Sequence, residues 1–136
     1  MSNGFSIVNI RDVENAAERQ GLAPELEARF AGKALELEDS GFSYQKLAPK
    51  FRTPWGHRHE RQEELYLILS GDGRMKIEDQ IIQVKAWDAI RVPSDQMRAF
   101  EAGDEGLELL AFGAPHVGAK GNDVKDMTPN WWSEAG

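Results

Sequence analysis

The sequence of 136 residues contains no cysteine, which excludes disulfide bonds and thiolate metal ligands. Any metal ion would therefore have to be held by imidazole and carboxylate groups. Positive charge is also scarce, with 16 lysine and arginine residues against 23 aspartate and glutamate residues, for a net charge of −7. A chain this acidic repels the phosphate backbone of nucleic acids, so we expect no nucleic-acid partner.

Long apolar runs are absent as well. No stretch approaches the ~20 residues that a membrane-spanning helix needs, so we expect no membrane partner. The segment Met1 to Ile10 lacks the basic start and long apolar stretch of a secretion signal, which favours a cytoplasmic location. The length is that of one domain, large enough to bury a core without covalent cross-links.

The N-terminal part of the chain, residues 1–37, is expected to form a helix and an extension. The segment Ile10–Gly21 has the pattern of a short amphipathic helix, with Asp12 as its N-cap and Gly21 at its left-handed end. Its buried stripe would consist of Val13, Ala16 and Ala17. The following stretch, residues 24–37, is compatible with either a helical turn or a strand.

Alternating apolar and polar residues dominate residues 38–113 and predict a β-barrel. We expect strands at residues 42–47, 64–69, 74–78, 81–86, 89–92, 97–101 and 106–112, with turns at residues 70–73 and at Gly103. Short strands at this spacing are typical of a sandwich or barrel. Residues 114–136 are expected to form a C-terminal tail, whose Trp131 and Trp132 should pack back onto the domain or onto a partner subunit.

Two of the three histidines, His57 and His59, are two residues apart. On a strand they would share one face, and Glu64 at the start of the next strand could bring a carboxylate to the same place. Two imidazoles and one carboxylate suit Zn²⁺, Fe²⁺, Mn²⁺ or Ni²⁺. On spacing alone, a solvated charged loop with two incidental histidines is the slightly favoured explanation.

The surrounding residues resemble the cupin superfamily. The run Gly56–Glu64, followed by Gly71, is similar to the first cupin motif, which selects Glu64 rather than Glu63 because of its distance from Gly71. Trp87–Asp88 and Pro93 resemble a degraded second motif. The resemblance covers roughly residues 44–112. It implies an all-β fold, the double-stranded β-helix or jelly-roll barrel, with a metal site at His57, His59 and Glu64.

Three positions depart from the family pattern. Trp87 and Asp95 stand where the family has glycine, and Arg98 stands where it supplies a third histidine ligand. A guanidinium cannot ligate a cation. Two alternatives stay open: Arg98 turns aside and the other three residues hold a metal, or Arg98 enters the barrel, pairs with Glu64, and leaves the pocket without a metal.

Strand alternation also suggests which residues line the barrel. If Glu64 faces inward, so does Tyr66, and Phe100 accompanies Arg98. Gln45 is a further candidate lining residue, and Arg98 could bind an anionic small-molecule ligand. The third histidine, His116, is expected to be a surface residue. Unpaired edge strands in such barrels favour a homodimer.

Two functions therefore remain. The first is a metal-dependent protein that binds or acts on a small anionic molecule. The second is a metal-free cupin that binds or senses a ligand without catalysis. The sequence does not decide whether the protein is an enzyme.

Overall fold

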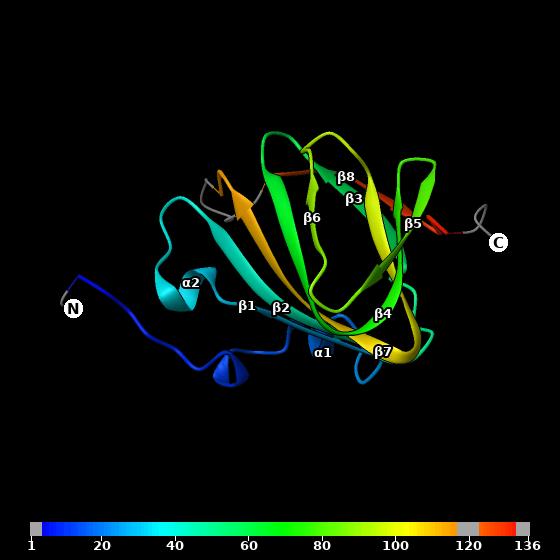
Figure 1. Ribbon diagram of the computed structural model, residues 1–136. Helices are drawn as coiled ribbons and strands as arrows, with labels where there is room; N and C mark the ends of the chain where they lie inside the picture. Colours follow the sequence, from blue (N-terminus) through cyan, green and yellow to red (C-terminus); the bar gives the residue numbers. More distant parts are fainter. Residues whose placement is uncertain (1–3, 117–122, 133–136) are drawn as a thin grey trace.

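Two long antiparallel strands, β4 (Glu63–Ile77) and β7 (Arg98–Ala114), form the backbone of the fold. They pair with each other from Glu63 opposite Ala114 to Ile77 opposite Arg98. The computed structural model describes residues 4–116 and 123–132, and within these ranges the strands join one eight-stranded sheet that curls into a barrel (Figure 1). The remaining strands are β1 (Leu26–Phe30), β2 (Gly41–Leu47), β3 (Trp55–His59), β5 (Gln80–Lys85), β6 (Ala89–Val92) and β8 (Val124–Pro129).

The core lies inside this curled sheet. Alternate residues of the long strands point inward, as the two-residue period of a strand requires, and each large apolar side chain buried there stabilises the fold by about 1.5–3 kcal/mol. The largest apolar side chains that are fully buried are Leu47, Ile68, Met75, Val92, Leu107 and Leu109. The prediction of an all-β jelly-roll barrel is confirmed.

Two of the expected turns are wrong. The glycines near residues 70–73 and 103 do not end strands, because β4 and β7 continue through them with shifts of register near Gly71. Gly71 has φ of 79°, and a Cβ there would lie 2.1 Å from the backbone oxygen of Gly106. Glycine is therefore needed where the two strands bend across each other.

The short N-terminal helix is present, but it is divided. A 3₁₀ turn covers Ile10–Asp12, and α1 covers only Ala16–Arg19. Asp12 is not the N-cap that we expected, because the side chain of Asn15 accepts hydrogen bonds from the N–H groups of Ala17 and Ala28 and starts the helix later.

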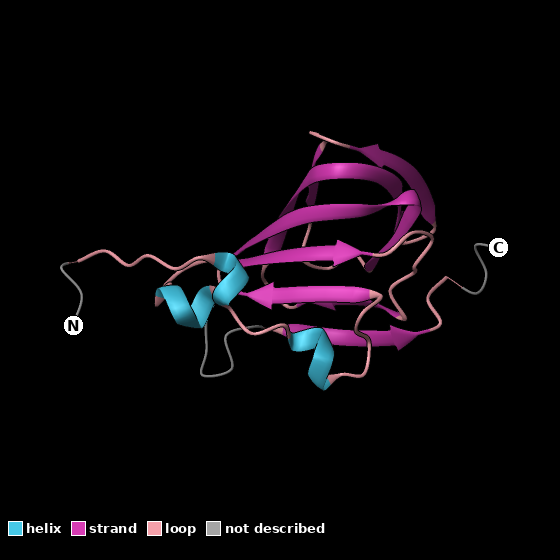
Figure 2. Cartoon of the chain, turned by 90° about the horizontal axis from the view of Figure 1, so that it is seen from below, coloured by secondary structure: helices cyan, strands magenta, loops and turns pink. Residues whose placement is uncertain are grey.

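The ambiguous stretch after residue 24 contains both kinds of element, β1 and then a helical turn, α2 (Gly32–Leu35). The helices pack beside β1 and β2 at one side of the barrel (Figure 2). Across the residues that the structure describes, no helix has the length and apolar character to cross a membrane.

The range that we expected to be a tail contains an additional strand. β8 runs antiparallel to β3, with Trp55 opposite Pro129 and His57 opposite Met127. Beyond it, the Trp132 side chain is only 3% exposed, and the guanidinium groups of Arg52 and Arg74 lie over its ring. Trp131 is half-buried, with Nζ of Lys76 4.3 Å from its ring centroid, so the prediction that the tryptophan pair packs back onto the domain is confirmed.

Candidate metal centre

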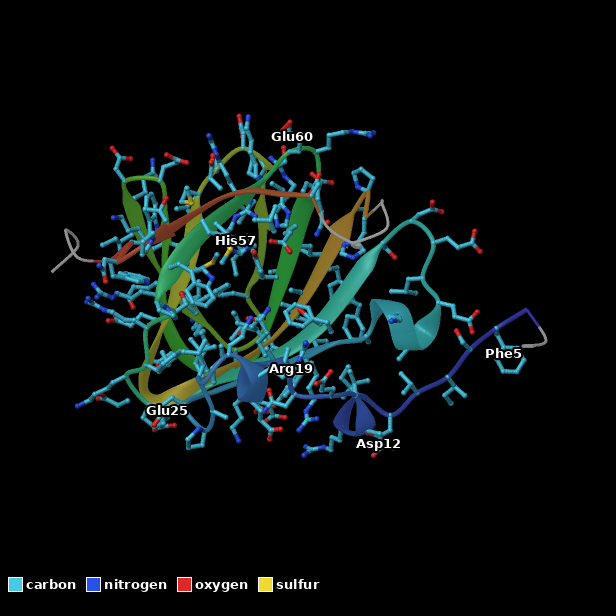
Figure 3. The ribbon with its side chains drawn as sticks, turned by 180° about the vertical axis from the view of Figure 1, so that it is seen from behind. Phe5, Asp12, Arg19, Glu25, His57 and Glu60 are labelled. Carbon is cyan, nitrogen blue, oxygen red and sulfur yellow. The ribbon has the colours of Figure 1, made fainter. Side chains whose placement is uncertain are left out.

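β3 and the start of β4, which follow each other in the chain but pair with different strands, bring His57, His59 and Glu64 together. The Nε2 atom of His57 lies 3.4 Å from Oε1 of Glu64, and Nε2 of His59 lies 3.2 Å from the same oxygen. The possible ligand atoms of the three residues all lie within 4.8 Å of one another. The spacing argument is therefore correct about their convergence, and His57, on β3, is labelled in Figure 3.

Asp123, which the sequence did not single out, fixes the orientation of His59. Its Oδ1 lies 3.0 Å from Nδ1 of His59, and its Oδ2 accepts backbone N–H groups of Arg61 and Gln62 at 2.7 and 3.0 Å. The His59 side chain is 4% exposed. Within the described part of the chain, Nε2 of His59 has no hydrogen-bond partner despite its closeness to Glu64.

Strand β3 owes its position mainly to β8. Among the described residues, β3 meets β7 at a single register pair, His57 opposite Arg98, whereas it is paired with β8 along its whole length. The ion pair between Arg58 and Asp126, at 2.5 Å, strengthens this second contact on the face away from Glu64. The imidazoles are thus carried by a strand that the C-terminal part of the chain holds in place.

Arg98 lies inside the barrel and does not turn aside. Its side chain is 0% exposed, Nη1 lies 3.0 Å from Oε1 of Glu64, and Nη2 donates to the carbonyl oxygen of Pro93 at 2.6 Å. Its Nε has no hydrogen-bond partner among the described residues. A buried guanidinium needs a negative partner, and Glu64 provides it.

Of the other expected lining residues, Tyr66 is closest to the site. Its hydroxyl donates to Oε1 of Glu64, and its ring makes an edge contact with Phe100 at a centroid distance of 5.0 Å. Tyr66 and Phe100 are both buried, and they fill the interior behind Glu64. Gln45 lies on the same face of β2 as the buried Ser43, to which its side chain donates at 3.3 Å.

Two residues outside the predicted set extend the cluster toward the surface. The buried Gln62 places Nε2 3.5 Å from Oε2 of Glu64, and its Oε1 lies 2.9 Å from Nδ1 of His116. His116 is half-buried and lies outside the group of possible metal ligands, so it is a partly exposed histidine held by Gln62. No local pattern in the sequence could have identified either contact, because both depend on how β4 and the end of β7 meet.

The electrostatics of the cluster favour an ionised Glu64. Burial raises the pKa of this carboxyl, but the nearby imidazoles of His57 and His59 outweigh burial and hold the pKa well below its ordinary value of 4.5. Burial and the negative charge of Glu64 raise the pKa of Tyr66 well above 10.0, so the hydroxyl keeps its proton. Burial also raises the pKa of Asp123, but the N–H groups of Arg61, His59 and Gln62 bring it below 3.8.

These shifts predict acid sensitivity. Glu101 behaves similarly, because the guanidinium groups of Arg52 and Arg74 outweigh burial and lower its pKa. The folded-state pKa values of Glu64, Glu101 and Asp123 thus lie below their ordinary values, so their contribution to stability is complete above the unfolded-state pKa and is lost as the pH falls toward the folded one. We expect the urea midpoint of unfolding to fall steadily between about pH 5 and pH 3. A midpoint that stays constant over this interval would contradict the expectation.

Comparison with known proteins agrees with this architecture. Residues 43–113, just over half of the chain, match the cupin domain family, and the chain therefore belongs to the cupins. A search of curated proteins gave no significant match.

Among solved structures, a cupin protein from Bacteroides fragilis shares 21% sequence identity at a TM-score of 0.69, over 93% of this chain and 99% of its own. KdgF from Halomonas sp. shares 16% identity at a TM-score of 0.60, over 71% of this chain and 85% of its own. A variant of oxalate decarboxylase from Bacillus subtilis shares 22% identity at a TM-score of 0.74, over 93% of this chain but only 33% of its own. At these identities the likeness concerns the fold alone.

Proposed function

We propose that this cupin binds a divalent metal ion through His57, His59 and Glu64 and uses the site on a small anionic molecule. The observation that carries the proposal is the environment of His59, whose ring lies between two carboxylates. Asp123 takes the N–H at Nδ1, which leaves Nε2 facing Glu64 at 3.2 Å. Two lone pairs at that distance repel each other, so a cation has to stand between them, either a proton or a metal ion.

The geometry of the donor atoms fits a metal ion. Nitrogen and oxygen ligands about 2.0–2.2 Å from a metal are separated from each other by roughly 3–3.5 Å at neighbouring corners of the coordination polyhedron. The separations of 3.4 and 3.2 Å from Glu64 to the two imidazoles are in this range. A histidine that ligates a metal usually donates its other ring N–H to a carboxylate, as Nδ1 of His59 does to Asp123.

Each residue then has a role in the proposed site. His57 is the most exposed of the three ligands, at 29%, so a small molecule would approach from its side. Arg98 and Tyr66 hold Oε1 of Glu64 in place, and the charge of Arg98 favours an anionic molecule near the ion. A bound divalent ion would supply Lewis-acid or oxygen-activating chemistry. The similarity to an oxalate decarboxylase makes oxalate a reasonable first probe.

A metal-free ligand-binding protein is the second candidate, and the Arg98–Glu64 contact at 3.0 Å favours it, because the guanidinium already supplies a cation to the carboxylate. Elemental analysis of untagged protein, followed by chelation and titration with Zn²⁺, Mn²⁺, Fe²⁺ and Ni²⁺, separates the two. One metal ion bound per chain, and lost in His59→Ala, is the expected result. If none of the four ions binds, the metal proposal is wrong and the metal-free alternative stands.

A further inference from the structure

The N-terminal arm, residues 4–9, turns its large apolar side chains away from its own barrel. Phe5 and Ile7 are 68% and 88% exposed, and Figure 3 shows Phe5 far from the body of the molecule. In an extended chain alternate residues face opposite ways, and here Ser6 and Val8 face the domain. The Ser6 hydroxyl donates to the carbonyl oxygen of Leu35 at 2.5 Å, and Val8 is half-buried. The apolar side of the arm is thus left in water.

An apolar groove lies directly beside this arm. Its apolar lining includes Val8, Val13, Ala16, Phe30 and Ala34, from the arm, the region around α1, the end of β1 and α2. Phe30 remains 57% exposed there. β1 is the last strand at this end of the sheet, and although Asn15 bridges to Arg29 on its free edge, Phe30 at its end stays accessible to another chain.

We infer that the groove is occupied by Phe5 and Ile7 of a second copy of this chain, in a homodimer with reciprocally exchanged arms. The arm adjoins the groove through Val8, so both lie on one side of the molecule. A two-fold axis placed there brings each arm against the other copy's groove, and one operation covers both apolar surfaces.

The charges in this region favour a second copy. The chain carries a net charge of −7, so two copies repel each other over most of their surfaces. Residues 1–10 contain no charged side chain. The charged residues at the groove balance, with Asp12 and Glu14 against Arg19 and Lys33. This side is therefore one where two acidic chains can approach without a penalty from like charge.

Sedimentation velocity of the full chain between about 1 and 100 µM tests the inference. We expect a dimer whose dissociation constant rises at least roughly tenfold in both Ile7→Asp and Phe30→Asp, because each puts a carboxylate into the apolar contact. Trp87→Asp is the matched control, since Trp87 is 75% exposed and lies outside the groove, and should leave the dimer unchanged. Ile7 is so exposed that its replacement should not disturb folding.

A wild-type chain that stays monomeric over this range would overturn the inference, as would a dimer indifferent to both variants. Arm exchange is tested separately by oxidising a mixture of Ile7→Cys and Phe30→Cys chains that carry tags of different size and have been refolded together. The natural chain has no cysteine, so a disulfide between the two kinds of chain reports arm-to-groove contact between copies. Its absence from dimeric samples would exclude the exchange.

Discussion

Replacing Arg98 by histidine is expected to tighten the binding of a divalent metal ion by roughly a hundredfold, or about 3 kcal/mol. Two effects act in the same direction. The change removes a buried positive charge that lies 3.0 Å from Glu64, and it adds an imidazole at a position directly opposite His57 in the register of β3 and β7. Isothermal titration of the chelated proteins with Zn²⁺ or Mn²⁺ measures the difference.

Two further variants show where the effect comes from. Arg98→Met removes the charge without adding a ligand and should give an intermediate gain in affinity. Arg91→His makes the same exchange on the exposed face of β6, where Arg91 is paired only loosely with Glu63 at 3.5 Å, and should change nothing. If Arg98→His and Arg98→Met both fold and bind metal no better than the natural chain, the ligand set that we propose is wrong.

Replacing Glu64 by glutamine is expected to lower the free energy of unfolding of the metal-free protein by about 3–5 kcal/mol, the cost of leaving a buried charge without its partner. The Arg98 side chain is 0% exposed, and its contacts with the new amide and with the carbonyl oxygen of Pro93 would carry no negative charge. Urea denaturation in the presence of a chelator measures the loss without any contribution from metal binding.

The adjacent residue provides the control. Glu63→Gln alters the same kind of side chain one position earlier, but Glu63 is 60% exposed and should cost less than about 0.5 kcal/mol. The double variant Glu64→Gln with Arg98→Met should recover much of the stability, because it removes both charges together. Equal losses in Glu63→Gln and Glu64→Gln would refute the idea that the buried pair is an energetic unit.

The sequence was most informative where one strand, or the short connection between two consecutive strands, determines the geometry. The alternation of His57 and His59 on β3, and the short spacer to Glu64, predicted that these side chains meet, and they do. The same rule put Tyr66 beside Glu64, where its hydroxyl donates to the carboxylate. The spacing of the second cupin motif also predicted that residue 98 lies at the metal site, and Arg98 does lie against Glu64 there.

Contacts between distant segments could not be predicted in this way. Asp123 is 64 residues from His59 in the sequence, and its neighbourhood has no pattern that marks a histidine partner. The bend at Gly71 was predicted as a turn, and the bend at Gly106 was missed. A glycine that ends a strand and a glycine that lets two strands cross cannot be distinguished from the neighbouring sequence. Asp12 and Asn15 are both good N-caps, and only the contact of Asn15 with Ala28 on β1 decides between them.

The dependence of β3 on β8 has a consequence for biosynthesis. A ribosome makes His57, His59 and Glu64 well before it makes Asp123 and the strand that aligns with β3. During that interval β3 lacks its main partner strand, β8, and Asp123 does not yet fix the ring of His59. The pocket can therefore be completed only after translation has passed residue 129, and a stalled or prematurely terminated chain would carry the ligand residues without a formed pocket.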